Sequence, residues 1–240
     1  MAGTGSTSES APGRTTPIIS AQAVTRVFGS GETAVTAVNN VTLDVLPGEF
    51  LAVVGRSGSG KTTLLNLMSG LDRPTTGSVF FLGRDLATMS DADLVELRRH
   101  KVGFVFQSFG LMPLLSAVEN VELPLHIRGA SWRQRHQLAL ETLELVGLGP
   151  RARHRPYELS GGEQQRVSIA RALVTGPDVV FADEPTGELD TTTAMSITAI
   201  LQDIAAHRGT TVIVATHDLT LAAMCTRTES LQDGALVPSA

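Results

Sequence analysis

Residues 55–62 read Gly55-Arg56-Ser57-Gly58-Ser59-Gly60-Lys61-Thr62 and follow the apolar run from Glu49 to Val54. This spacing matches the phosphate-binding loop G-x-x-x-x-G-K-[ST], and its place between a predicted strand and a helix predicted from about Thr62 to Ser69 supports the match. Glycines let backbone N–H groups turn inward around a phosphate chain, and a helix N-terminus adds a favourable dipole. The stretch therefore predicts a phosphate-binding site in an α/β fold.

Two side chains of this loop have individual roles to fill. We expect Lys61 to reach the β- and γ-phosphates as a compact charge and the Thr62 hydroxyl to bind Mg²⁺. Only Lys61 and Lys101 are lysines among the 19 basic residues, so the chain uses Arg almost everywhere else. The other residues expected to contact the nucleotide are Gly55, Ser57, Gly58, Ser59, Gly60 and Thr63.

The flanking sequence predicts two kinds of sheet. The segments Ile18 to Phe28 and Val35 to Val45 favour an antiparallel pair with one solvated face. Buried strands and helices alternate on either side of a middle region, which predicts a parallel sheet covered on both faces. We expect a helical insertion at roughly residues 88–170. The later elements are strands at Val179–Ala182 and Thr211–Thr216, helices at Thr191–Ala206 and Leu219–Cys225, and a hairpin turning at Asp233-Gly234.

Polar residues follow two of the predicted strands. Asp183 and Glu184 come directly after Val179–Ala182, and His217 follows Thr211–Thr216. Ligands of open α/β sheets bind beyond the carboxyl ends of the strands, so these side chains should face the phosphate loop. We expect Asp183 to hold Mg²⁺ through water, Glu184 to orient or deprotonate the attacking water, and His217 to contact the γ-phosphate.

A second glycine pair occurs in Leu159-Ser160-Gly161-Gly162-Glu163-Gln164-Gln165-Arg166. Ser160 and Glu163 form an S-x-x-E capping box, which explains part of this pattern structurally. Gly161 and Gly162 weaken a helix in its first turn, but they open backbone N–H groups to an anion. A second phosphate-binding element has no use on a nucleotide already held by the first. We therefore expect it to serve the nucleotide of another copy.

The run Leu159 to Gln164 resembles the LSGGQ signature of ABC ATPases, and the resemblance extends from about Ile18 to Val237. It implies a phosphate-loop NTPase core at residues 18–240, with an antiparallel β-subdomain and an inserted α-helical subdomain that carries the signature. It also implies that Gln107 touches Mg²⁺ and the attacking water, and that Asp190 belongs to the D-loop. Phe28 lies where the family stacks an aromatic ring on adenine; packing in the core of the β-subdomain is the alternative for this residue.

The stretches Phe104 to Phe109 and Glu119 to Leu125 resemble a subgroup of ATPases for lipoprotein release, macrolide export and cell division. This implies a homodimer that closes head-to-tail on two MgATP and drives a separate integral-membrane permease from the cytoplasmic face of the cell membrane. The alternative from the same subgroup is a mechanical signal across the membrane without transport. The apolar run Leu111 to Leu115, within residues 108–125, is expected either to receive a permease helix or to pack in the helical subdomain.

Composition weighs against other classes of protein. The formal net charge is −5 and no basic stripe is visible, which disfavours a nucleic-acid partner. An ABC-type protein of DNA repair or chromosome organisation would also be expected to contain coiled-coil insertions or zinc knuckles, and the sequence shows neither. The single cysteine, Cys225, suits a reducing compartment. No apolar run approaches the ~20 residues of a membrane helix. Residues 1–17 are rich in Gly, Ser, Thr and Pro and predict a disordered tail.

Overall fold

The computed structural model describes residues 16–238 of the chain. Residues 1–15 of the predicted tail therefore lie outside the described residues. Within the described part, no helix combines the length and the apolar character needed to cross a lipid bilayer.

The predicted parallel sheet is present, and within residues 16–238 it has five parallel strands and one antiparallel edge strand. Its order is β10 (Ala235–Val237), β9 (Arg227–Gln232), β3 (Phe50–Val54), β8 (Thr211–Thr216), β7 (Val179–Asp183) and β6 (Val102–Val105). The five strands from β9 to β6 run parallel, and β10 returns antiparallel to β9. Strands β3, β7 and β8 are apolar along nearly their whole length because helices cover both faces of the sheet.

A second, antiparallel sheet lies beside the first. It contains β2 (Val35–Val45), β1 (Ile19–Phe28), β4 (Thr76–Phe81) and β5 (Arg84–Asp85), in that order. The expected pairing of the first two strands is confirmed, and every pair in this sheet is antiparallel. Helix α1 (Lys61–Met68) packs between the two sheets, where Leu64 and Leu67 are fully buried. The phosphate loop at the start of α1 is thereby anchored to both sheets.

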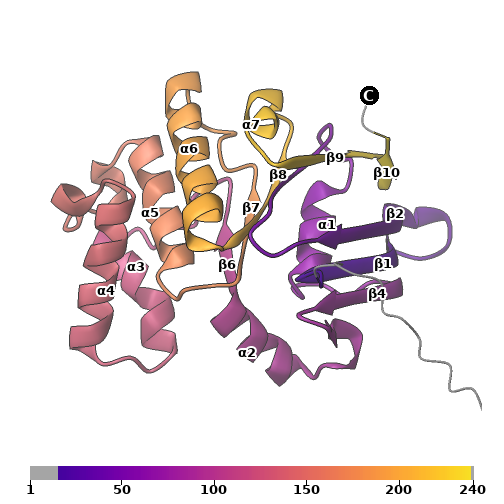
Figure 1. Cartoon of the computed structure of the whole chain (residues 1–240), viewed down its shortest axis with the longest axis horizontal. Helices are drawn as coiled ribbons and strands as arrows, with labels where there is room; N and C mark the ends of the chain where they lie inside the picture. The colour runs from indigo at the N-terminus through magenta and orange to yellow at the C-terminus, as the bar shows by residue number, and fades with distance from the viewer. Residues whose placement is uncertain (1–15, 239–240) are drawn as a thin grey trace, which may run out of the picture.

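The remaining helices form the other side of the molecule (Figure 1). Helices α3 (Ala117–Ile127), α4 (Trp132–Leu145) and α5 (Gly161–Leu173) gather at the end opposite the antiparallel sheet. They share an apolar core that includes Val121, Leu143 and Ile169. The others are α2 (Asp91–Lys101), α6 (Thr191–Arg208) and α7 (Leu219–Ala223), with short 3₁₀ turns at Gly31–Thr33, Leu86–Thr88, Gly149–Arg151 and Pro156–Glu158.

The insertion predicted at residues 88–170 differs from the structure in one respect. Strand β6 lies inside this range, and it pairs with β7 in the parallel sheet. The sequence around Val102–Val105 is short and apolar, a pattern that also fits a buried helix segment. The helices of the insertion are therefore interrupted by a strand of the core, and the three that pack together extend from Ala117 to Leu173.

Four serines explain where the helices of this region begin. Ser90, Ser116, Ser131 and Ser160 each cap a helix and form a reciprocal capping box with the third residue of that helix. The box at Ser160 was expected from the sequence, and its presence confirms that prediction. Helix α3 was not among the predicted helices, because Pro124 lies within it and proline usually ends a helix.

Candidate functional site

The loop between β3 and α1 has the backbone geometry of a phosphate cradle. Gly58 and Gly60 adopt left-handed conformations with φ of 80° and 102°. A Cβ atom at Gly60 would overlap the carbonyl oxygen of Ala37, so this position requires glycine. The ammonium group of Lys61 lies inside the curve of the loop, where it donates to the carbonyls of Gly55 at 2.8 Å and Arg56 at 3.1 Å. The lysine and the loop backbone therefore face one common space.

That space is a cleft of about 360 Å³ to which segments far apart in the sequence contribute. Gln107, Glu184 and His217 reach it from the ends of β6, β7 and β8. The strand pattern predicted this place for Glu184 and His217, and the family resemblance implied it for Gln107. Its lining is completed by Ala37, Ser57, Gly58, Gly60, Lys61, Thr62 and Thr63. Ala37 was not predicted, because an alanine on an exposed strand carries no chemical signal. Gly55 and Ser59 do not line the cleft, but they form the loop behind it.

Side-chain oxygens of the kind that bind magnesium lie at the start of α1. The Thr62 hydroxyl donates to the Asp183 carboxylate at 2.9 and 3.1 Å. Burial raises the pKa of Asp183, and the neighbouring Glu184 adds to this, while the Thr62 hydrogen bond and Lys61 oppose it. A half-buried carboxylate beside a hydroxyl suits a hard cation. Gln107, which the family resemblance implies as a further ligand, lines the same cleft. Residues 16–238 contain no cluster of three or more His, Cys, Asp or Glu suited to a metal.

The carboxylate of Glu184 is held from two sides. One oxygen lies 3.3 Å from the Lys61 ammonium, and the other accepts a hydrogen bond of 2.9 Å from Nδ1 of His217. The Glu184 side chain is 15% exposed and the His217 side chain 65% exposed. A carboxylate fixed in this way at the wall of a phosphate cleft has the geometry of a group that orients or deprotonates water.

The second glycine motif lies outside this cleft. Ser160 accepts from the backbone N–H of Glu163, whose carboxylate accepts from the Ser160 N–H at 2.8 Å, so the predicted capping box is present. None of the residues Ser160, Gly161, Gly162 and Glu163 lines the cleft. A Cβ atom at Gly162 would overlap the methyl group of Thr193, and this close packing of α5 on α6 is a structural reason for glycine there. In one chain, the motif and the phosphate loop are not brought together.

Two further predicted residues also lie away from the cleft. Asp190 caps α6, accepting from the N–H of Thr193 at 3.1 Å and from its hydroxyl at 2.6 Å. Phe28 is 42% exposed at the end of β1, and the guanidinium of Arg26 lies 4.5 Å from its ring centroid. Packing of Phe28 in the core of the β-subdomain, the alternative considered above, is therefore wrong.

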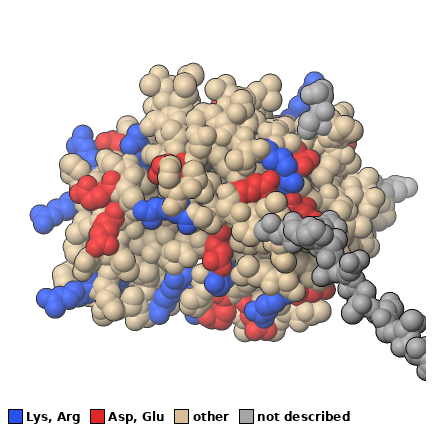
Figure 2. All heavy atoms as spheres, viewed as in Figure 1, with Lys and Arg blue, Asp and Glu red and all other residues tan. Residues whose placement is uncertain are grey.

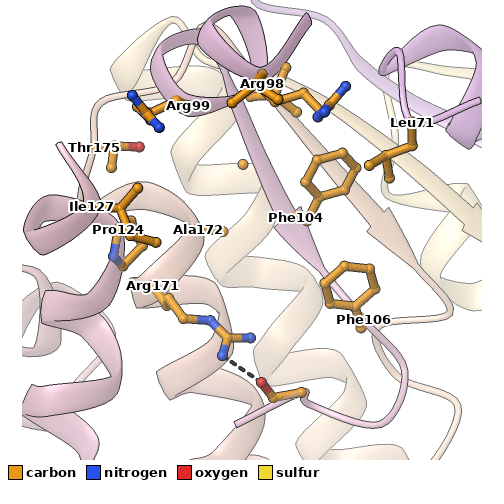
Figure 3. Close-up of a pocket in the computed structure, with 14 residues that line it drawn as sticks. Leu71, Arg98, Arg99, Phe104, Phe106, Pro124, Ile127, Arg171, Ala172 and Thr175 are labelled. Carbon is orange, nitrogen blue, oxygen red and sulfur yellow. Dashed lines mark hydrogen bonds between the residues drawn. The ribbon is translucent and has the colours of Figure 1, made fainter. Parts of the chain in front are cut away.

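An apolar groove of about 490 Å³ opens between α2, β6, α3 and α5 (Figure 3). Phe104, Phe106 and Ile127 contribute apolar surface, and the arginines at 98, 99 and 171 border it. Arg171 donates to the carbonyls of Gly110 at 2.6 Å and Phe109 at 2.9 Å, so one wall of the groove is bonded to the loop that follows Gln107.

The groove does not coincide with the apolar run that the sequence singled out. Of residues 108–125, Gly110 and Pro124 line it, whereas Met112 and Leu114 are 50% and 79% exposed outside it. Leu111 packs partly against the core of the helical layer, so core packing accounts for part of the run. The groove is instead assembled from distant segments, which periodicity in the sequence does not reveal.

Charged side chains are distributed without a dominant sign on the face shown in Figure 2, where acidic and basic residues alternate over the surface. This face offers no basic stripe of the kind that neutralises a phosphate backbone.

Comparison with known proteins gives consistent matches. Residues 38–187 match the family model described as ABC transporter. The chain is 45% identical over 221 residues to the lipoprotein-releasing system ATP-binding protein LolD of Alcanivorax borkumensis, covering 92% of this chain and 97% of LolD. It is 46% identical over 221 residues to the macrolide export ATP-binding/permease protein MacB of Marinobacter nauticus. That match covers 92% of this chain but 34% of MacB, so the chain spans about a third of that relative.

Solved structures match over the same region. The ATP-binding cassette MJ0796, solved as a dimer in a post-hydrolysis state with ADP and Pi, superposes with a TM-score of 0.85 at 43% identity. The match covers 92% of this chain and 97% of MJ0796.

Proposed function

The chain belongs to the ABC transporter family as an ATP-hydrolysing cassette, and we propose that two copies close on MgATP to drive a separate integral-membrane permease.

The observation that supports a dimer is that one chain holds only part of a hydrolytic site. Its cleft contains the phosphate loop, Glu184 and His217, whereas Ser160 to Glu163 lie elsewhere on the surface. The N–H groups at the start of α5 are a second anion-binding element with no phosphate of the same chain to bind. A head-to-tail pair gives this element a ligand, because each phosphate loop then faces the Ser160–Glu163 segment of the partner copy.

Within each cleft, different residues bind the phosphates, bind the metal ion and activate water. The loop backbone and Lys61 hold the phosphates, with Thr62 and Thr63 at the helix start. Thr62, Asp183 and Gln107 would hold Mg²⁺, which would neutralise charge on the phosphate oxygens. Glu184 orients the attacking water and accepts its proton, while Lys61 and His217 fix the carboxylate. His217 is exposed enough to contact the γ-phosphate as well.

Phe28 and Asp190 complete the proposed assignments. The Phe28 ring is 42% exposed at the end of β1, and we assign the face opposite Arg26 to stacking on adenine. Asp190 caps α6 and accepts from the hydroxyl of Thr193, whose methyl group lies against Gly162 of the signature segment. We assign it to the contact between the two copies. Residues 18–240 then form one ATPase domain.

The permease is proposed to contact the groove of Figure 3. Its apolar floor and bordering arginines suit a short helix with an apolar face and an acidic side chain. Arg171 ties this groove to Phe109 and Gly110, two and three residues after Gln107, so movement of the partner helix reaches the phosphate cleft. This arrangement makes the chain a peripheral subunit on the cytoplasmic face of the cell membrane.

The cargo class follows the relatives named for lipoprotein release and macrolide export, so we propose extrusion or release of a lipidic, peptidic or drug-like cargo. The test of the dimeric mechanism is the ATPase rate per chain as a function of protein concentration. We expect this rate to rise with concentration and to reach a plateau when pairs are saturated. A rate per chain that is constant down to nanomolar concentration would show that one copy suffices.

A further inference from the structure

Helix α5 carries a buried glutamine whose contacts lie in the catalytic loops. Gln165 is fully buried, although it lies only two residues after the signature glutamate Glu163. Its Nε2 donates to the carbonyl of Pro185 at 2.6 Å and lies 3.5 Å from the carbonyl of Phe106. One side chain therefore contacts the loop after β7 and the loop after β6.

Both contacted residues adjoin groups that line the phosphate cleft. Pro185 follows Glu184, and Phe106 precedes Gln107. The two loops leave neighbouring strands, since Val105 at the end of β6 pairs with Ala182 of β7. Gln165 is thus placed at a junction between the signature helix and the backbone of two cleft residues.

The backbone of Glu184 needs support from its surroundings. Its φ is 46°, in the left-handed region that disfavours residues with a Cβ atom. The following proline further restricts this residue, because its ring disfavours helical conformations of the residue before it. Such a conformation persists only when neighbouring contacts hold it. The Glu184 N–H donates to Ala215 at 2.9 Å, the Gly187 N–H donates to the Glu184 carbonyl at 3.1 Å, and Gln165 holds the next carbonyl.

The other end of the carboxamide is left without a hydrogen bond. No donor among the described residues reaches Oε1 of Gln165, and this atom is buried. Unsatisfied buried polar atoms are uncommon, and an apolar side chain of the same size would avoid this one. The bond to Pro185 is therefore the contact that distinguishes glutamine from an apolar residue at this position.

We propose that Gln165 is a positioning residue that couples the signature helix to the catalytic carboxylate of Glu184. When the nucleotide of the partner copy draws the start of α5 inward, Gln165 carries this displacement to Pro185 and so to Glu184. The inference rests on the proposed assignment of Glu184 as the group that activates water.

The principal test replaces Gln165 by Met, which keeps the volume and removes the donor. We expect kcat to fall about 10- to 100-fold, since small misplacements of a catalytic group have effects of this size. KM and the affinity for ATP should change by less than about twofold, because an interaction used only in the transition state affects kcat alone. Gln165→Asn, which keeps the amide but shortens its reach, should also lower kcat.

Ser168→Ala is the matched control on the same helix. Ser168 is likewise fully buried, and its hydroxyl has no hydrogen-bond partner among the described residues, so no side-chain hydrogen bond joins it to either loop. Its kcat should equal that of the wild type. Thermal unfolding and ATP binding, measured on all three variants, separate a loss of folding from a loss of turnover.

A double-mutant cycle distinguishes this inference from the function on which it rests. If Gln165 acts through Glu184, Gln165→Met should have no further effect on the residual rate of Glu184→Gln. A large loss in Glu184→Gln with unchanged kcat in both folded Gln165 variants would overturn the positioning role alone. Additive losses in the double variant would overturn it too. An unchanged rate in Glu184→Gln would instead overturn the assignment of Glu184.

Discussion

Nδ1 of His217 lies 2.9 Å from Oε2 of Glu184, and these two residues follow β8 and β7, neighbouring strands of the parallel sheet. The backbone N–H of His217 also donates to the same oxygen at 3.3 Å. With the Lys61 ammonium 3.3 Å from the other oxygen, the carboxylate has little freedom to turn. Its role as a proton acceptor is the first assignment to test.

Glu184→Gln should bind MgATP but hydrolyse it slowly. The carboxamide still contacts water but does not take its proton, and a general base typically contributes about 10²–10⁴-fold in rate. Single-turnover hydrolysis gives the rate, and gel filtration with MgATP should show an accumulated dimer. Turnover near that of the wild type would rule out Glu184 as the base.

Asp183→Asn should stabilise the protein while removing activity that depends on Mg²⁺. Burial raises the pKa of Asp183, so its contribution to stability is present below the ordinary pKa and is lost as pH rises through the raised value. At neutral pH the ionised carboxylate therefore costs stability, and asparagine removes this charge.

The measurement for Asp183→Asn is the melting temperature in EDTA without nucleotide. The melting temperature of the variant should exceed that of the wild type at pH 7. In a chain of this size, each 1 kcal/mol gained in the free energy of unfolding raises the melting temperature by roughly 2–4 °C. The difference should shrink as the pH is lowered toward about 4. A lower melting temperature for the variant at pH 7 would contradict the destabilising role of the charge.

Gly162→Ala should have two effects that a second substitution separates. The added Cβ overlaps the methyl group of Thr193, and such overpacking typically costs about 1–3 kcal/mol. Thr193→Ser removes that methyl but keeps the hydroxyl that bonds Asp190 at 2.6 Å. Gly162→Ala/Thr193→Ser should therefore recover the melting temperature. Its ATPase rate should stay low if the partner's phosphate must approach Gly162, and ATP binding by the single chain should be normal.

Thr193→Ser alone is the control, with an expected wild-type rate. Mixing the double variant with Lys61→Ala extends this test. In a head-to-tail pair one site then combines both lesions and the other contains neither, so activity should return in the mixture. No recovery, together with lost ATP binding in the double variant, would place Gly162 in the site of its own chain.

Ile127→Glu should remove the response to a permease. Ile127 lines the groove of Figure 3 and is 62% exposed, so a charge there disturbs docking without disturbing the core. Basal ATPase should be unchanged, while stimulation by the permease in nanodiscs should be lost. Trp132→Glu is the control, because Trp132 is 63% exposed but does not line the groove. Full stimulation of Ile127→Glu, with assembly intact, would move the docking surface elsewhere.

The sequence alone determined the phosphate loop and the strand ends that face it, because both are specified by short local patterns. The spacing of Gly55 to Lys61 specifies a turn that only glycines permit and a lysine that faces it. The apolar strands before Asp183 and His217 end in polar residues, and parallel strands bring such ends to one edge of the sheet. Glu184 and His217 line one cleft with the phosphate loop, as this pattern predicted, and Gln107, which the family resemblance implied, lines it too.

Tertiary structure alone decided which residues support this site. The sequence predicts that Gly162 opens backbone N–H groups to an anion. The structure adds a packing reason for glycine, because a Cβ atom there would overlap the methyl group of Thr193. Strand β6 reads as part of a helical region until its pairing with β7 is known. The bond from Gln165 to Pro185 joins residues 20 positions apart, and the bond from Arg171 to Gly110 joins residues 61 positions apart. The groove is lined by residues as distant in the sequence as Leu71 and Thr175. Contacts of this kind depend on how helices dock on the sheet, and hydrophobic periodicity records which face of a helix is buried but not what it touches.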